Sequence, residues 1–429
     1  MRLNASFVKL LDRKIYFFAG SKYFRYDISS DRTDSGYPLD IKDNWKGLWP
    51  EKIDAAFNLD LDKVYFFRGG EYALYSLSAD KVSDGYPRPI KGNWKGLWAD
   101  NLDAAVNWNN GKAYFFKGSE YIRYDLAADR ADQGYPKPIN QSWKGVWSEG
   151  IDTVVNFNNK KAYFFKGDEY IRYDVASDQA DPGYPLPIAD FWLGLAPLKK
   201  TTAFDPAKHG FHFANSFEIN PRLFGVTDLK SWGLGLCGGM CLAALDRFNA
   251  HTPIPALDHP PAQKCPELDL FWELFGRLVV TLFPVAWLRI AQWQITPEAD
   301  YDVPSVTSVP TSSGQPLNAV PTSQRMHGIG YSTTHDEWPK LKAALDQAKP
   351  TILCLVRQKD AEDPSKNHQV LAIGYQMDDI DHLKIQIYDP NHPDKTEELQ
   401  LELGRADHSI NGNETDGKAF RGFFVITKV

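Results

Sequence analysis

The chain contains few cysteines and histidines, and both are confined to its second half. Only four of the 429 residues are cysteine and ten are histidine. The cysteines are Cys237, Cys241, Cys265 and Cys354, and the first histidine is His209. These cysteines are too sparse for a disulfide scaffold and are not spaced as two zinc-binding pairs. We therefore expect a reducing environment, with any thiol or imidazole chemistry beyond residue 200.

Long apolar segments and concentrated positive charge are also missing. The longest uncharged apolar run, Leu278–Leu288, is about half of the roughly 20 residues that a membrane span needs. The net charge is −7 and lysine and arginine form no cluster, which argues against a nucleic-acid partner. The first 14 residues have no apolar core of signal-peptide length, so we expect a cytoplasmic protein or one released without a signal peptide.

A repeat with a period of 49 residues fills residues 1–195. The Tyr-Phe-Phe sequence begins at Tyr16, Tyr65, Tyr114 and Tyr163, and Gly-Tyr-Pro follows in each copy. We therefore expect all four copies to keep the same register. Each copy holds about four strand-length runs between turn residues, and one copy alone cannot cover its own apolar faces. The sequence therefore predicts an all-β, four-bladed propeller over residues 1–198, with blades at about 1–52, 53–101, 102–150 and 151–198.

One tryptophan recurs near the end of every copy. The four positions are Trp45, Trp94, Trp143 and Trp192. Buried aromatic side chains of this kind mostly pack against other rings, so we expect them between the blades rather than in a ligand cage.

The repeats resemble the hemopexin family, whose blades read Asp-Ala-Ala, then Tyr-Phe-Phe-Lys-Gly, then Tyr-x-Arg-Tyr-Asp. The resemblance implies an axial channel lined by backbone carbonyls that binds a calcium or sodium ion, a hard cation that suits oxygen ligands. The matching positions are Asp54, Asp103 and Asp152, with Ala5 in the first copy as a departure from the pattern. The family's covalent closure is missing because this half has no cysteine, so closure is expected to rest on packing.

Haem, the ligand of the family's namesake, requires axial ligands such as histidine. The first histidine lies beyond the repeats, so we expect no haem site in the propeller. A fold of this kind is a scaffold for recognition, and we expect it to bind a protein or a glycan surface.

The segment 199–429 carries a glycine-rich turn that leads into a helix, and Cys237 stands where that helix begins. The free N–H groups and the dipole at a helix N-terminus favour a thiolate and can stabilise an oxyanion. Cys241 lies one turn farther along and is interpreted as a buried structural thiol.

A base and an orienting group for this thiol follow on two predicted strands. His368 begins the apolar run 368–375, and Asp389 directly follows the run 383–388. The sequence predicts a triad of Cys237, His368 and Asp389, with Asn391 as the substitute for the aspartate.

These motifs resemble the papain-like cysteine peptidases, most closely the branch that cleaves double-glycine leader peptides. Its Cys-Gly-x-Ala-x-Leu-Ala motif matches residues 237–243 except that Met240 replaces alanine, and its His-x-Val-x-x-x-Gly-Tyr motif matches residues 368–375. The resemblance implies an α+β papain-like domain, and a helix at 338–349 before a strand at 351–356 suits it. The family's oxyanion glutamine is missing, because Ser231 and Trp232 stand at its position; Asn215 is a possible replacement donor.

Three other features of this half are interpreted from their composition, two of them with an alternative. Residues 297–324, rich in Ser, Thr, Pro and Val, indicate a long mobile loop, either a lid or a cleavable surface loop. Residues 268–293 are interpreted as buried helix, with an exposed partner groove as the alternative. His392 and His408 are interpreted as surface residues.

Two hypotheses of function follow. The first is a thiol hydrolase or acyl transferase, peptidase-like, that the propeller guides to its target. The second is a non-catalytic binding protein whose papain-like domain is silent. The complete Cys, His and Asp set favours the first and the missing glutamine favours the second. Regular repeats beside such a domain would suit a bacterial interaction factor.

Overall fold

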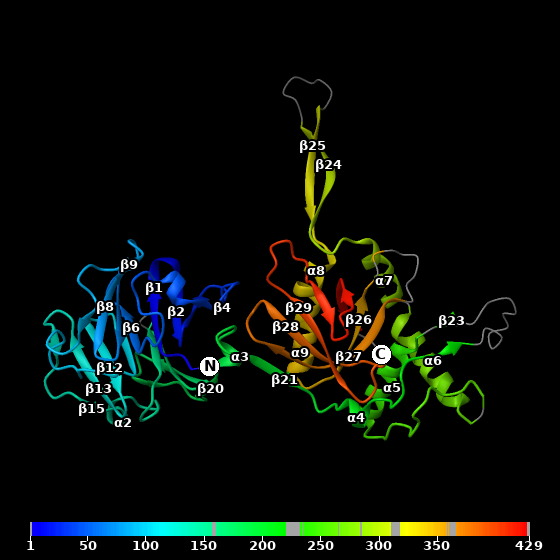
Figure 1. The fold of residues 1–429 in the computed structure, drawn as a ribbon, viewed down its shortest axis with the longest axis horizontal. Coiled ribbons are helices and arrows are strands. Elements are labelled where there is room, and N and C mark those ends of the chain that lie inside the picture. The colour runs from blue at the N-terminus through cyan, green and yellow to red at the C-terminus, as the bar shows by residue number, and fades with distance from the viewer. Residues whose placement is uncertain are drawn as a thin grey trace. The chain divides into compact units, whose positions relative to one another are not determined.

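The computed structural model describes residues 2–156, 160–219, 232–233, 235–264, 266–283, 285–309, 318–357, 359 and 366–426. The chain divides into two compact units, which are drawn in Figure 1. One comprises Met1–Leu198 with Asp378–Ile380, and the other comprises Lys199–Met377 with Asp381–Val429.

The first unit consists of four antiparallel sheets, one for each repeat, as predicted. The first sheet holds β1 (Ala5–Lys9), β2 (Lys14–Ala19), β3 (Lys22–Asp27), β4 (Arg32–Thr33) and β5 (Leu39–Asp40). The second holds β6 (Ala55–Asn58), β7 (Lys63–Arg68), β8 (Glu71–Ser76), β9 (Lys81–Val82) and β10 (Arg88–Pro89). The third holds β11 (Ala104–Asn107), β12 (Lys112–Lys117), β13 (Glu120–Asp125), β14 (Arg130–Ala131) and β15 (Lys137–Pro138). The fourth holds β16 (Thr153–Asn156), β17 (Lys161–Lys166), β18 (Glu169–Asp174), β19 (Gln179–Ala180) and β20 (Leu186–Pro187). Short helical turns η1 (Leu10–Asp12), α1 (Ile41–Asn44), α2 (Ile139–Ser142) and α3 (Ile188–Phe191) complete the blades.

The recurring tryptophan packs between blades, which confirms the prediction. Each of the four indoles is buried and lies against a tyrosine of the next blade. The ring centroids are 5.0 Å apart for Trp45 and Tyr75, 5.0 Å for Trp94 and Tyr124, 5.4 Å for Trp143 and Tyr173, and 5.0 Å for Trp192 and Tyr26. Aromatic contacts at this distance add to the burial of apolar area that holds the blades together.

The ring closes through hydrogen bonds as well as packing, so the expectation of closure by packing alone is wrong. Thr33 N–H donates to the Leu193 carbonyl over 2.9 Å, which joins the first blade to the last. The same backbone bond occurs at the other three interfaces, from Val82 to Lys46, from Ala131 to Lys95 and from Ala180 to Lys144. The buried hydroxyls of Ser6 and Thr153 add a contact of 2.7 Å across the closing interface.

The first repeat is out of register with the others by one residue at its inner strand. Ala5 pairs with Phe18, whereas Ala55 pairs with the equivalent Phe67. The turn between β1 and β2 is therefore one residue longer than its counterparts, with Arg13 in the left-handed conformation. Asn4, not Ala5, is the structural counterpart of Asp54.

A shared hydrogen bond supports this corrected register. Gly20 N–H donates to Asn4 Oδ1 over 3.0 Å, as Gly69 N–H donates to Asp54 Oδ2 over 2.5 Å. Asp103 and Asp152 accept the equivalent bonds from the glycines of their own blades. The fixed period of 49 residues hid this shift.

The second unit is built on an eight-stranded sheet in the order β31-β30-β29-β28-β27-β26-β32, with β21 paired to β27. Every pair of neighbouring strands along the order from β31 to β32 is antiparallel. The strands are β21 (Leu198–Thr201), β26 (Thr351–Val356), β27 (His368–Met377), β28 (His382–Tyr388), β29 (Thr396–Glu402), β30 (Gly412–Glu414), β31 (Ala419–Phe420) and β32 (Gly422–Val425). The predicted strands at 351–356, 368–375 and 383–388 are thus confirmed as β26, β27 and β28.

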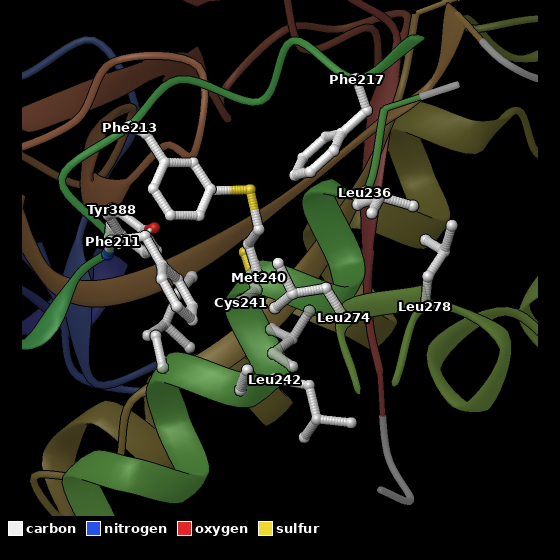
Figure 2. Close-up of a cluster of buried hydrophobic side chains, with 14 of the residues drawn as sticks. Phe211, Phe213, Phe217, Leu236, Met240, Cys241, Leu242, Leu274, Leu278 and Tyr388 are labelled. Atoms are coloured by element: carbon white, nitrogen blue, oxygen red, sulfur yellow. Dashed lines mark hydrogen bonds between the residues drawn. The ribbon is translucent and has the colours of Figure 1, made fainter. Parts of the chain in front are cut away.

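The helices of this unit are α4 (Pro206–His209), α5 (Cys237–Ala250), α6 (Leu268–Leu282), α7 (Val285–Ile295), α8 (Ile329–Ser332), the π-helical turn η3 (Thr333–Glu337) and α9 (Trp338–Asp346). Two short strands, β22 (Glu218–Ile219) and β23 (Trp232–Gly233), form a separate pair. Helix α5 is buried at its start and packs against α6 and β27. Figure 2 shows the apolar cluster around it, in which Met240 and Cys241 lie among Phe213, Leu274 and Tyr388.

The segment predicted as a mobile loop forms a hairpin instead. Strands β24 (Tyr301–Val309) and β25 (Asn318–Met326) pair antiparallel, with Tyr301 opposite Met326. They extend away from the large sheet (Figure 1). Valine and threonine favour extended strands, and prolines such as Pro304 are tolerated because both strands are edges. The proline content of this segment suggested a loop, whereas its β-propensity agrees with the observed strands. Residues 310–317 lie outside the described part of the chain.

The segment 268–293 is only half buried, so the prediction of a buried helix is wrong for one face. Phe271 and Leu274 are buried on α6, whereas Val280 is 52% exposed and Leu288 on α7 is 68% exposed. Among the described residues no single helix is long and apolar enough to cross a membrane, although the bent pair α6 and α7 passes that test of length and composition together.

Candidate active site

The predicted nucleophile stands at the first position of α5. Leu236, the residue before the helix, makes no side-chain capping hydrogen bond, so no cap occupies the first N–H groups of the helix. The N–H group of Gly238 acts on the Cys237 thiol. Gly238 and Gly239 follow, and both are needed for close packing. A Cβ on Gly239 would lie 1.9 Å from the Leu274 carbonyl of α6, and one on Gly238 would lie 2.1 Å from the Gln369 side chain. The glycines thus let α5 approach α6 and β27, which places Cys237 beside the start of β27.

The structure brings Cys237, His368 and Asp389 together. Nε2 of His368 lies 2.6 Å from Oδ1 of Asp389, and both side chains are 4% exposed. Asp389 also accepts a hydrogen bond of 2.8 Å from Asn391 N–H. Because Asp389 holds Nε2, the other ring nitrogen, Nδ1, remains for the thiol. The side chain of Asn391 lies 3.2 Å from Nε2, so the predicted substitute stands beside the aspartate.

The electrostatics of this group favour a thiolate and imidazolium pair. Burial raises the pKa of the Cys237 thiol, but the hydrogen bond and charge of His368 and the N–H groups of Gln369 and Gly238 outweigh it, so the pKa falls below its usual value. Burial lowers the pKa of His368, but the charge and hydrogen bond of Asp389 raise it to about 9. Burial acts to raise the pKa of Asp389, and the His368 charge overrides it, so this pKa is lowered.

The other described cysteines lack this environment. Burial raises the pKa of Cys241 well above its usual value, and its thiol lies 3.6 Å from the Gln369 carbonyl. Burial likewise raises the pKa of Cys354. Both thus remain protonated, which fits the interpretation of Cys241 as structural. Cys265 lies outside the described residues.

Asn215, the possible replacement for the family's oxyanion glutamine, lies beside the start of α5. Its Oδ1 accepts a hydrogen bond of 2.6 Å from Leu236 N–H, and its Nδ2 donates to Asn391 Oδ1 over 3.2 Å. Its own N–H donates to the Pro390 carbonyl over 2.9 Å. The side chain is therefore fixed from both sides. Ser231 lies outside the described residues, and the side chain of Trp232 is not described.

Gln369 is a residue of the site that the sequence analysis did not single out. Its backbone N–H donates to Cys237 Sγ over 3.4 Å, and its side chain is buried beside Gly238. Both polar atoms of its side chain lack a hydrogen-bond partner among the described residues. A buried amide without partners is costly and is expected at functional positions. Its place directly after His368 was the signal available in the sequence.

A cavity of about 510 Å³ is lined by Cys237 and His368. Its apolar wall comes from α6, α7 and β26, and its polar wall from the segment before β27 and the turn after β28. The lining side chains include Leu278, Leu282, Trp287 and Ile290 on the apolar side and Arg357, Lys366 and Lys418 on the polar side. A second cavity of about 770 Å³ shares Asn215 and Gly235 with the first, so the cleft continues past the start of α5.

Comparisons with known proteins bear on the first unit. The hemopexin family model matches residues 4–50, 53–99, 102–148 and 151–197. Matrix metalloproteinase-18 of Xenopus laevis is 48% identical over 44 residues, which are 10% of this chain and 9% of that protein. The chain thus matches less than a tenth of that relative's length.

Two solved structures are similar to the same unit. A plant lectin with two metal binding sites from Cicer arietinum is 25% identical over 45% of this chain and 96% of its own, with a TM-score of 0.41. The hemopexin fold protein CP4 from cow pea is 25% identical over 44% of this chain and 95% of its own, with a TM-score of 0.40.

The family match and the four sheets together define the first unit. Residues 4–197 hold four hemopexin repeats and form a four-bladed β-propeller. The second unit joins a mostly antiparallel sheet to helices.

Proposed function

We propose that the second unit is a thiol hydrolase or acyl transferase in which Cys237 is the nucleophile. The observation that carries the proposal is the buried contact between His368 and Asp389 beside a thiol whose pKa is lowered. A structural cysteine has no need of such a pair. Papain-like cysteine peptidases, which the motifs resemble, use this chemistry, and a peptidase is the narrower form of the same proposal.

In the reaction, the Cys237 thiolate attacks a carbonyl carbon and forms a tetrahedral oxyanion. Protonated His368 gives its Nδ1 proton to the leaving group as the carbon–leaving-group bond breaks, which leaves an acyl thioester on Cys237. His368 then takes a proton from water, or from an acceptor amine or hydroxyl, whose oxygen or nitrogen attacks the thioester. Collapse releases the acid or the acylated acceptor and restores the thiol. Asp389 holds the imidazole in the required tautomer throughout.

The oxyanion needs hydrogen-bond donors, and two sources support this step. The first is the start of α5, where the N–H groups are directed out of the helix. The second is Asn215 Nδ2, which has two hydrogens and gives one to Asn391. Removal of one such donor costs about 10²–10³ in rate, so Asn215→Ala is expected to lower the rate of acylation by that factor.

The cleft suggests the class of acyl group. Leu278, Leu282 and Trp287 give an apolar wall that suits an aliphatic chain or an apolar side chain. Because the second cavity continues past Asn215, the substrate can extend on both sides of the bond that reacts. We therefore expect an extended substrate with an apolar acyl portion.

Acyl-enzyme formation tests the proposal directly. The full chain is incubated with p-nitrophenyl acetate and p-nitrophenyl octanoate near pH 7, quenched in acid and digested for mass spectrometry. We expect a burst of p-nitrophenol and an acyl group on Cys237, lost in Cys237→Ala and slowed by about 10²–10⁴ in His368→Ala. Cys354→Ser is the matched control and retains the burst. If Cys237 is acylated no faster than Cys354, the second unit is silent and the chain is a binding protein.

For the propeller, we propose recognition of a protein or glycan surface and a hard cation in its channel. The residues fit a cation, because burial and the negative charge of Asp103 both disfavour the ionised form of Asp54 and raise its pKa, and a cation in the channel would offset both effects. With the corrected register, the carbonyls of Asn4, Asp54, Asp103 and Asp152 would hold the ion, rather than that of Ala5. We expect calcium or sodium to raise the melting temperature of the full chain, and no stabilisation by either ion would refute the site.

A further inference from the structure

Three side chains from distant parts of the chain meet away from the candidate active site. Asp300 directly precedes β24, His327 directly follows β25, and His408 lies in the turn after β29. Asp300 Oδ2 is 2.8 Å from His408 Nδ1 and 3.2 Å from His327 Nδ1. One ligand atom from each residue lies within 4.8 Å of the other two. His408, which the sequence suggested to be a surface residue, is 34% exposed and pairs with Asp300.

The set of donors suits a divalent transition-metal ion. Two imidazole nitrogens and one carboxylate oxygen are the ligands of many zinc sites, and zinc bonds of about 2.0–2.2 Å place neighbouring ligand atoms roughly 3.3 Å apart. The contacts of His327 with both oxygens of Asp300, 3.2 and 3.3 Å, already have this spacing. The shorter contact of His408 has to lengthen by about 0.5 Å.

The surroundings hold the three groups in place but leave one side open. The Asp300 side chain is 2% exposed, and Gly328 N–H donates to its Oδ1 over 3.2 Å. The Tyr331 ring stacks on the imidazole of His327 at a centroid distance of 3.6 Å. The side chain of His327 is 54% exposed, so a water molecule can complete the coordination from solvent.

One positive charge competes with a metal ion at this position. Arg325 Nε lies 3.7 Å from Asp300 Oδ2. Its side chain is 60% exposed, so it can turn into solvent when an ion binds. Its removal should therefore strengthen metal binding rather than weaken it.

We propose that Asp300, His327 and His408 form a zinc-type metal site that fastens the base of the β24–β25 hairpin to the turn at residues 405–408. The two residues that flank the hairpin both contribute ligands, and Asp300 N–H already donates to the Asp407 carbonyl over 2.9 Å. An ion at this point would join chain segments 108 residues apart and stabilise the folded state by mass action.

Metal titration of the full chain tests this site. We use a Cys237→Ala background, because a thiolate beside a histidine also binds zinc. Cobalt is added first and read by absorption, and zinc is then titrated by calorimetry. We expect one ion per chain, visible d–d bands without a thiolate charge-transfer band, and a rise in melting temperature. Asp300→Asn and His408→Ala are expected to abolish this binding, and Arg325→Gln to tighten it.

His212→Ala is the matched control, because His212 also pairs with an aspartate, Asp394, at an exposed position. It should leave the binding unchanged. His327→Ala provides a variant at an exposed side chain in case Asp300→Asn fails to fold, which circular dichroism will reveal. The proposal is overturned if the parent chain shows no saturable binding, or if the binding survives both His327→Ala and His408→Ala.

Discussion

The imidazole of His368 and the carboxylate of Asp389 are joined over 2.6 Å although the residues are 21 positions apart in the chain. His368 is the first residue of β27, and Asp389 directly follows β28, the neighbouring antiparallel strand. Leu371 pairs with Tyr388, so the start of β27 and the end of β28 lie at the same end of the sheet. This register is what turns two separate sequence motifs into one site.

The first prediction concerns the pH dependence of Cys237 alkylation. Because His368 and the nearby N–H groups lower the pKa of the thiol, labelling by iodoacetamide should persist at pH values where an ordinary thiol, with a pKa of about 8.5, is protonated. In His368→Ala the remaining burial should raise the pKa, and labelling should begin only at alkaline pH. Peptide mass spectrometry measures each cysteine separately, with Cys241 and Cys354 as internal references. Equal profiles in both proteins would contradict the ion pair.

The second prediction is that Asp389→Asn lowers the pKa of His368 from about 9, because the charge and hydrogen bond of Asp389 then no longer oppose burial, and only the contact with Cys237 still raises this pKa. NMR of selectively labelled histidine rings measures this, with His368→Ala to assign the signal. A folded-state pKa above the ordinary 6.5 stabilises the native chain fully below pH 6.5, and this contribution is lost as the pH rises through 9. In Asp389→Asn that loss of stability should become smaller; an unchanged His368 pKa would contradict the assignment.

The third prediction is that alanine has opposite effects on stability at two glycines, one on α5 and one on α6. Gly239→Ala should lower the free energy of unfolding by about 3 kcal/mol or more, because its Cβ would collide with the Leu274 carbonyl. Gly276→Ala on α6 is the control, because no atom lies within 4 Å of a Cβ placed there. It should raise the stability by about 1 kcal/mol through helix propensity. Chemical denaturation followed by circular dichroism compares the two, and equal effects would refute the close approach of α5 and α6.

The fourth prediction tests the register of the first blade. Asn4→Asp reproduces the residue found in the other blades and should change stability by no more than about 1 kcal/mol. Ala5→Asp places a carboxylate at a fully buried position and should cost about 3–5 kcal/mol. Denaturation monitored by tryptophan fluorescence reports on the propeller. If Ala5→Asp is the better tolerated change, the period of 49 residues holds in the first blade and our register is wrong.

The sequence determined those parts of the protein that depend on local pattern. Alternating apolar residues and turn residues recur with the repeat, so the four sheets and the packing of Trp45 and its counterparts were predictable. The order of Cys237, His368 and Asp389 relative to a helix start and two buried strands was also readable, because helix termini and strand ends have local signatures.

The tertiary structure decided what depends on contacts between distant residues. One extra residue in a turn moved Asn4 into the position expected for Ala5, and a repeat period cannot reveal where a turn absorbs an insertion. Asn215 reaches Leu236, the residue before Cys237, and Gln369 reaches Cys237 itself only through the packing of a loop and a strand against α5. The meeting of Asp300 with His408 likewise depends on where a hairpin leaves the sheet. Sequence patterns set which segments are helix or strand, whereas pairing and packing over long separations set which side chains meet.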